Sequence, residues 1–177
     1  MTSPANPTRS DAVRNRDLLV AAAREVLAEQ GLDAPMSAVA KRAGVGQGTL
    51  YRHFPDRLTL ATAVLEENVR EIEQVAARPD ATLADVLGVV TWQMIHSTAF
   101  VGIIRLSGEE SSRFLADRVR TAIDALPRET FGTDDLLLAL AMVSGGVHGP
   151  TPEARETSAR RAWDLLGIEI GPVTPGV

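Results

Sequence analysis

Residues 36–54 read MSAVAKRAGVGQGTLYRHF, and this stretch decides how the rest of the chain is interpreted. Two short segments with helical spacing flank the run Gly44-Val45-Gly46. Gly44 can adopt the left-handed conformation that a tight turn between two helices requires. Leu50 and Phe54 are four residues apart, so they share one face of the second segment and can pack it on the first. The spacing predicts a helix-turn-helix, with a purely structural helical hairpin as the alternative.

The rest of the chain also follows a helical pattern, and no alternating strand pattern of useful length is present. Before the stretch, a helical segment ends at Gly31, and after it Asp56 is placed to cap a long helix. Further helices are expected from about 82 to 99, from 111 or 112 to 126, from 133 or 134 to Gly145-Gly146, and from about 152 to 166. The sequence therefore predicts an all-α fold.

Composition excludes several classes of protein. The 177 residues contain no cysteine, so disulfides, thiol catalysis and thiolate metal sites are ruled out. No run approaches the ~18 apolar residues of a membrane span, and the first residues lack an apolar secretion segment, so we expect a cytoplasmic location. The three histidines form no metal-binding pattern, and neither a phosphate-binding loop nor a nucleophile elbow is present. We therefore expect no enzyme, no metal and no cofactor.

The formal net charge of −5 is unevenly distributed. Residues 1–57 hold eight basic and six acidic side chains, a balance of +2, and the remaining residues hold ten basic and seventeen acidic ones, a balance of −7. A polyanion prefers the basic part of such a chain. The asymmetry indicates two different tasks in one protein.

Residues 44–54, GVGQGTLYRHF, strongly resemble the recognition-helix signature of the tetracycline-repressor (TetR) family of transcriptional regulators. The wider match spans about residues 14–65, and the last 110 or so residues show only that family's all-helical layout. The first residues (1–12) are rich in Pro, Ser, Thr and Asn and are expected to form a flexible arm. The resemblance implies a helix-turn-helix DNA-binding domain (13–56) and a helical ligand-binding and dimerisation domain (57–177). The alternative is a helical sensor or interaction protein that does not bind DNA specifically.

By position, the resemblance also implies which residues face an operator: Gln47, Gly48, Thr49, Tyr51 and His53. Tyr51 and His53 are expected to touch phosphates, and the paired donor and acceptor of Gln47 suit adenine. Arg57 matches a basic position that usually holds the DNA backbone. Met36 stands where the family often has a phosphate-binding threonine, so Ser37 is expected to cap the second helix and take over that contact.

Each of these side chains also has a structural interpretation. The ring of Tyr51 can pack between helices, His53 can be a surface or capping residue, and Arg57 can be an ordinary surface charge on its helix. The arm residues Arg9, Arg14 and Arg16 can reach a minor groove, but a solvated tail is the favoured interpretation.

For the larger domain, the pattern predicts an apolar effector pocket, with core packing as the alternative. The expected pocket residues are Trp92, His96, Phe100, Ile104 and Phe114. The last two helices are expected to pair with those of a second chain in a four-helix bundle, because the segment from Leu136 to Val143 is apolar nearly all round. The expected interface residues are Leu136, Leu140, Val143, Trp163 and Leu166, and a buried core helix is the alternative interpretation.

These expectations combine into a hypothesis for regulation. A homodimer would hold two recognition helices at successive half-sites of a palindromic operator. A small molecule bound in the larger domain would prefer a form that does not fit the operator, and would thereby release the repressor. The effector, the operator sequence and the choice between repression and activation are not encoded in any pattern of the chain.

Overall fold

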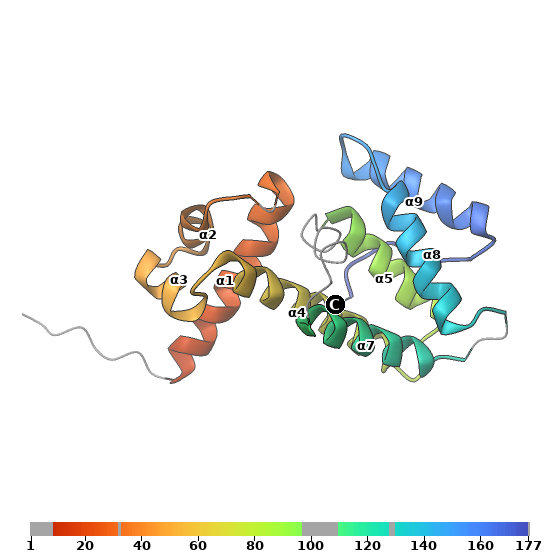
Figure 1. Cartoon of the computed structure of the whole chain (residues 1–177), viewed down its shortest axis with the longest axis horizontal. Coiled ribbons are helices and arrows are strands. Elements are labelled where there is room, and N and C mark those ends of the chain that lie inside the picture. Colours follow the sequence, from red (N-terminus) through yellow and green to blue (C-terminus); the bar gives the residue numbers. More distant parts are fainter. Residues whose placement is uncertain (1–8, 32, 97–109, 128–129, 177) are drawn as a thin grey trace, which may run out of the picture. The chain divides into compact units, whose positions relative to one another are not determined.

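The computed structural model describes residues 9–31, 33–96, 110–127 and 130–176. Within these residues it contains helices and no strands, as the sequence predicted (Figure 1). The helices are α1 (Arg9–Gln30), α2 (Met36–Ala43), α3 (Gln47–His53), α4 (Arg57–Ala76), α5 (Leu83–His96), α7 (Glu110–Asp124), α8 (Thr133–Gly146) and α9 (Pro152–Leu166). None of these described helices is both long and apolar enough to cross a membrane.

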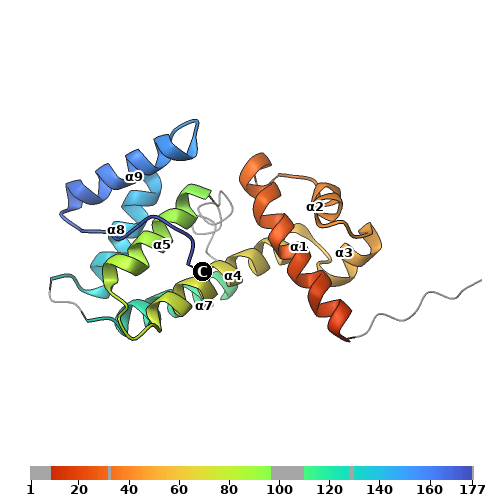
Figure 2. The same ribbon diagram turned by 180° about the vertical axis from the view of Figure 1, so that it is seen from behind.

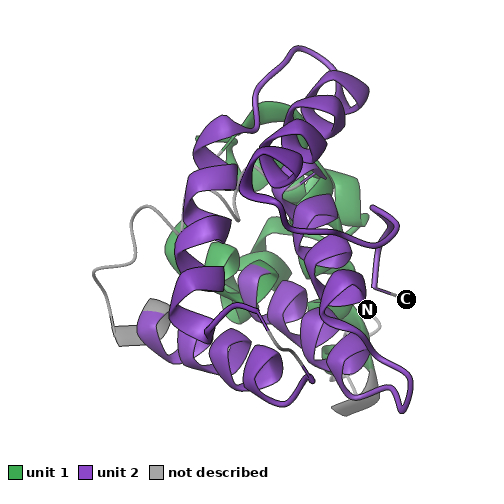
Figure 3. Cartoon of the chain, turned by 90° about the vertical axis from the view of Figure 1, so that its right-hand side faces the viewer, with its two compact units in different colours: residues 1–64 green, residues 65–177 purple. Residues whose placement is uncertain are grey.

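The chain divides into two compact units, residues 1–64 and residues 65–177 (Figure 3). The boundary falls inside α4, whose first residues belong to the N-terminal unit and whose second half belongs to the C-terminal unit.

In the N-terminal unit, α1 packs on α2 and α3 around a small apolar core. Fully or almost fully buried side chains come from all four helical segments and from the residue after α3: Leu19, Val26, Val39, Leu50, Phe54 and Leu60. Each such burial stabilises the fold by roughly 1.5–3 kcal/mol. Helix α1 begins at Arg9, within the segment predicted as a flexible arm. The acidic side chain of Asp11 in its first turn favours this earlier start, because it complements the positive end of the helix dipole.

The start of α4 is capped by Asp56, as the sequence predicted. The carboxylate Oδ1 of Asp56 accepts hydrogen bonds from the backbone N–H of Thr59 (2.7 Å) and from its hydroxyl (2.8 Å). These bonds favour the ionised carboxylate and lower the pKa of Asp56 below its usual value. The cap satisfies one of the backbone donors that a helix start leaves without an intrahelical partner.

Acid is therefore expected to weaken this cap. The folded-state pKa of Asp56 is lower than the unfolded-state one, so the cap stabilises the fold above the unfolded value and loses its effect as the pH falls through the folded value. Asp56→Asn keeps a capping oxygen without the charge. It should therefore fold near neutral pH and lose less stability than the wild type between about pH 5 and pH 2. Thermal unfolding across this range measures the difference, and identical pH profiles would contradict the prediction.

In the C-terminal unit, α5 is buried along most of its length and packs on α9. The core includes the side chains of Ile72, Leu87, Ile95, Ile123, Leu136 and Trp163, each at most 1% exposed. The start of α5 is closed by a reciprocal pair, because the backbone N–H of Asp85 donates to the hydroxyl of Thr82 and the N–H of Thr82 donates to the Asp85 carboxylate.

The sequence predicts Thr133 or Asp134 as the cap of α8, and this prediction is wrong. Its N-cap is Gly132, without a side-chain hydrogen bond, and Thr133 is the first helical residue. The hydroxyl of Thr133 is buried and donates to the carboxylate of Asp124, the last residue of α7. As the first residue inside α8, Thr133 cannot serve as its N-cap, and its hydroxyl instead links α8 to α7.

Candidate nucleic-acid interface

The turn between α2 and α3 has the geometry that its glycine predicted. Gly44 has φ 68° and ψ 26°, in the left-handed region, and its N–H donates to the carbonyl of Lys41. The N–H of Val45 donates back to the carbonyl of Ala40 at 3.1 Å. These two bonds terminate α2 and redirect the chain within a few residues. Gly46 then serves as the N-cap of α3.

Leu50 and Phe54 form the inward face of α3, as predicted from their spacing. Their side chains are 0% and 2% exposed, and they belong to the same core as Val39 of α2. The guanidinium of Arg16, on α1, lies 5.6 Å from the centre of the Phe54 ring. A cation over an aromatic face is a favourable contact, so α1 also holds the end of α3. The recognition helix is therefore fixed in orientation by buried contacts on one side only.

The opposite side of α3 carries the residues predicted to face DNA. Gln47, Gly48 and Tyr51 are exposed, while Thr49 and His53 are half-buried. Tyr51 is 50% exposed, so about half of its surface is available for a contact outside the chain. A methyl group added at Gly48 would meet no atom within 4 Å. Internal packing therefore does not require a glycine at position 48. The glycine instead leaves the outer surface of α3 without a protruding side chain at this position.

Arg52 has a contact that the sequence pattern did not indicate. Its Nε donates to the carbonyl of Gly48 and its Nη2 donates to the hydroxyl of Thr49, both at 3.1 Å. The side chain thus lies back along α3 and fixes the Thr49 hydroxyl. Because this hydroxyl accepts from Arg52, its own hydrogen remains available for donation to another acceptor.

Arg57 is exposed and pairs with Asp33 through Nη1 and Oδ1 at 3.2 Å. Both side chains are open to water, and exposed pairs of this kind contribute little stability, so a phosphate can replace the carboxylate. The capping role predicted for Ser37 is wrong: α2 starts after Pro35, with no side-chain capping bond, and Ser37 is its second residue. Its hydroxyl is instead exposed in the first turn of α2.

Arg42 forms ion pairs with two acidic side chains of the same unit. Arg42 bonds to Glu25 at 2.8 Å and to both carboxylate oxygens of Glu29, at 3.1 and 2.7 Å. These contacts hold the pKa of Glu29 below its usual value. Arg42 therefore joins α2 to α1, and its charge is largely neutralised. Sequence spacing did not reveal this, because the partners lie 13 and 17 residues away.

Two of the five residues predicted to line a pocket in the C-terminal unit lie side by side on α5. Trp92 and His96 stack at 4.6 Å between ring centres and are half-buried on α5. The predicted residues Phe100 and Ile104 lie outside the described residues. Phe114 was predicted wrongly, because its side chain is 63% exposed. The neighbouring Leu115 is the buried residue of that turn of α7, so Phe114 points about 100° away from the core.

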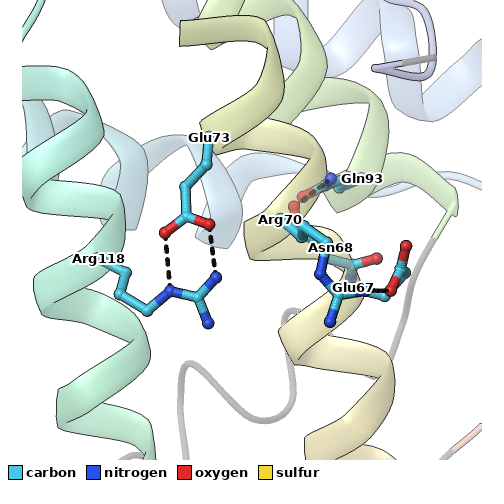
Figure 4. Close-up of polar contacts among 6 residues, drawn as sticks. All are labelled: Glu67, Asn68, Arg70, Glu73, Gln93 and Arg118. Carbon is cyan, nitrogen blue, oxygen red and sulfur yellow. Dashed lines mark hydrogen bonds and ion pairs between the residues drawn. The ribbon is translucent and has the colours of Figure 1, made fainter. Parts of the chain in front are cut away.

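Polar contacts tie the second half of α4 to its neighbours (Figure 4). The guanidinium of Arg118 in α7 donates two parallel hydrogen bonds to the carboxylate of Glu73, at 2.7 and 2.5 Å. This interaction lowers the pKa of the Glu73 carboxyl. Gln93 of α5 is completely buried, and its amide donates to the backbone carbonyl of Asn68 (2.9 Å) and to the carboxylate of Glu71 (3.2 Å). A single amide in the apolar run of α5 was the only sequence signal of this contact.

The interface residues predicted on α8 and α9 also need correction. Leu136, Leu140, Val143 and Trp163 are at most 7% exposed within one chain, so they form the core and not a surface. Leu166 is half-buried. The exposed apolar side chains of these two helices are Leu138 (62%), Met142 (56%) and Leu165 (79%). The all-round apolar character of α8 thus reflects one core face and one exposed face. No metal-binding cluster occurs among the described residues.

Comparisons with known proteins agree with this geometry. The family model of bacterial regulatory proteins of the tetR family matches residues 19–64. An HTH-type transcriptional regulator of Staphylococcus aureus is 41% identical over 76 residues, and another from the same species is 37% identical over 62 residues. These matches cover 39% and 34% of this chain and the same shares of the two relatives, so the likeness to curated proteins spans well under half of their length.

Two crystal structures resemble nearly the whole chain. A TetR transcriptional regulator from Streptomyces coelicolor has a TM-score of 0.62 and 27% identity, and the match covers 88% of this chain and 98% of that one. A TetR regulatory protein from Mycobacterium vanbaalenii has a TM-score of 0.55 and 29% identity, with 93% and 100% covered. Both of these proteins are named as transcription regulators. The N-terminal unit therefore carries the helix-turn-helix domain of the TetR family of transcriptional regulators, and the helical C-terminal region matches that of TetR structures.

Proposed function

We propose that this protein represses transcription by binding a palindromic operator as a homodimer, and that a small molecule releases it. The observation that carries the proposal is the outward face of α3. It presents Gln47, Gly48 and Tyr51 to solvent, while the opposite face is anchored in the core. A short helix held on one side and polar on the other can enter a major groove and read base edges.

The charge and surface of the N-terminal unit support this role. Its positive balance attracts a polyanion, while the acidic remainder limits indiscriminate binding. Arg57 at the start of α4 and Ser37 at the start of α2 are both exposed and suit backbone phosphates. The amide of Gln47 suits adenine, which offers one donor and one acceptor in the major groove. Because Gly48 has no side chain, the DNA backbone or a base edge can approach α3 closely at this position.

A dimer is part of the proposal because one short recognition helix reads few base pairs. Two copies related by a two-fold axis would read half-sites about 34 Å apart along the DNA. We assign the contact between chains to the exposed apolar side chains Leu138 and Met142 of α8 and Leu165 of α9. Leu138 and Met142 are four residues apart and therefore share one face of α8.

The dimer contact can be tested by placing charge on it. Leu138→Glu with Met142→Glu should give a monomer in sedimentation velocity at micromolar concentration, because four buried and unpaired carboxylates per dimer oppose association. The control is Val13→Glu, which puts one such carboxylate on a similarly exposed side chain (58%) of the N-terminal unit. If the double variant sediments as the wild type does, the interface lies elsewhere.

The proposed release works through α4. This helix is continuous from Arg57 to Ala76 and contributes to both units. Its second half is tied to α5 by Gln93 and to α7 by Arg118. An effector that binds the C-terminal unit better when these ties are rearranged would lower operator affinity by the coupling free energy, typically about 1–3 kcal/mol.

Selection from random duplexes tests the proposal and identifies the operator at the same time. The full-length protein is incubated with a pool of duplexes, bound DNA is recovered, and the cycle is repeated. We expect enrichment of an inverted repeat whose half-sites lie about one helical turn apart, as two-fold symmetry requires. A pool that stays random would contradict specific DNA binding and favour a helical sensor that does not read sequence.

A further inference from the structure

The last described residues form a strap across the C-terminal unit. Residues 167–176, here called the C-terminal strap, follow α9 without helix or strand. In Figure 2 the strap is the dark blue segment that crosses α5 and ends beside α4. The strap bonds to Ala84 of α5 through the N–H of Gly171, and a methyl group added at Gly176 would lie within 4 Å of Glu71 and Val75 of α4.

The strap meets α5 through backbone atoms at a distance that only glycine permits. The N–H of Gly171 donates to the carbonyl of Ala84 at 2.8 Å, in the first turn of α5. One turn later, a methyl group added at Gly88 would lie 2.5 Å from the carbonyl oxygen of Pro172. No real side chain tolerates that distance, and the obstructing atom belongs to the backbone. Any residue larger than glycine at position 88 must therefore push the strap away from α5.

The far end of the strap meets the second half of α4. Gly176 is buried, and a methyl group added there would lie 3.2 Å from Cβ of Glu71 and 3.3 Å from Cγ2 of Val75. Arg78, just after α4, donates from Nη2 to the carbonyl of Gly176 at 3.4 Å. The strap thus touches the same half of α4 that Gln93 and Arg118 hold, and it bridges this half to the start of α5.

The strap is held by few contacts. The side chains of Glu169, Pro172, Thr174 and Pro175 are exposed, and Ile168 is the only large side chain of the strap that is buried among the described residues. Pro172 and Pro175 have no N–H to donate. A segment with little buried apolar area and few backbone bonds opens at a lower free energy than the core on which it lies.

We propose that the C-terminal strap is a releasable clamp, which in its closed position fixes the second half of α4 against α5 and maintains the operator-binding form. Opening the clamp frees α4 without unfolding the unit. The part of this proposal that concerns the operator rests on the proposed function, while the clamp itself does not.

Two substitutions open the clamp from opposite sides. Gly88→Ala places the obstructing methyl on α5, and Gly171→Ala places one on the strap, 3.0 Å from the carbonyl oxygen of Ala84. The second variant changes a residue outside the helices, so it leaves the helices intact if the first fails to fold. The matched control is Gly145→Ala in α8, a helical glycine whose added methyl meets nothing within 4 Å.

Strap mobility can be measured with one spin label, because the chain contains no cysteine. Thr174→Cys carries the nitroxide on an exposed strap position in each background. We expect a restrained spectrum for the wild-type background and for Gly145→Ala, and a mobile spectrum for Gly88→Ala and Gly171→Ala. Hydrogen exchange of residues 71–78 should then be faster by about tenfold or more in the two opened variants, because the clamp opens locally. An immobile label in both variants, or a mobile label with unchanged exchange in α4, would overturn the clamp.

Operator titration of the same proteins separates the clamp from the proposed function. With the duplex that selection enriches, the opened variants should bind at least about tenfold more weakly than the control, in line with the usual range of coupling between sites. Equal affinity, together with a released strap, would overturn the coupling to the operator. If the wild type itself binds no duplex, the proposed function fails, and the label and exchange data still decide whether the strap is a clamp.

Discussion

Replacing Tyr51 with Ala should reduce operator affinity by roughly 30- to 1,000-fold. A tyrosine hydroxyl that donates to a charged phosphate contributes about 1–2 kcal/mol, and a two-fold symmetric dimer loses the contact in both half-sites. The tyrosine ring is 50% exposed and lies on the outer face of α3. The substitution should therefore leave the thermal unfolding midpoint close to that of the wild type. Fluorescence anisotropy with a labelled duplex measures the affinity.

Tyr51→Phe tells whether the hydroxyl or the ring makes the contact. The variant keeps the aromatic surface and removes only the donor, so it should lose most of the same affinity if a phosphate accepts the hydroxyl hydrogen. If Tyr51→Phe keeps the operator affinity and Tyr51→Ala loses it, the contact belongs to the ring. Wild-type affinity in both variants would show that this face of α3 does not meet DNA at position 51.

Replacing Trp163 with Ala should have the largest effect on stability. Trp163 is completely buried in the C-terminal unit, and its indole N–H donates to the hydroxyl of Thr91 at 2.9 Å. That hydroxyl in turn donates to the carbonyl of Leu87. Removing a buried tryptophan costs about 3–5 kcal/mol, which lowers the melting temperature of a protein of this size by roughly 6–20 °C. Differential scanning calorimetry at fixed protein concentration measures the shift.

Two further variants assign the cause of that loss. Trp163→Phe retains most of the buried area and removes the donor, so it should lose about 1 kcal/mol for the hydrogen bond plus a small cavity term. Arg161→Ala, two residues earlier on the exposed side of α9, should stay within about 0.5 kcal/mol of the wild type. A Trp163→Ala protein as stable as the Arg161→Ala control would mean that α9 is not part of the core.

The N-terminal unit was predictable because its signals are local. A glycine between two short helical segments specifies a left-handed turn, and Gly44 adopts it. Leu50 and Phe54 at i and i+4 specify an inward face, and both are buried. The remaining positions of α3 must then form its outer face. In contrast, the ion pairs of Arg42 join residues from different helices, and no short-range pattern encodes them.

The C-terminal unit was less predictable because its helices are apolar on more than one side. The pattern of α8 showed excess apolar surface without indicating which side faces inward, so Leu136 was assigned to an interface although it is core, and Leu138 is the exposed residue. The strap left no signal at all in the sequence. A glycine such as Gly88 inside an apolar helix does not reveal that a distant segment passes over it at contact distance.

Sequence-specific DNA binding is measured most directly by the affinity of the wild-type protein for two duplexes of equal length and composition. One duplex carries the enriched inverted repeat and the other carries the same bases in scrambled order, and both are titrated across a series of salt concentrations. We predict that the inverted repeat binds at least about a thousandfold more tightly at physiological salt. Its affinity should also fall linearly with salt on logarithmic axes, as neutralised phosphates release counterions. Equal affinity for both duplexes at every salt concentration would contradict the claim that α3 reads DNA sequence.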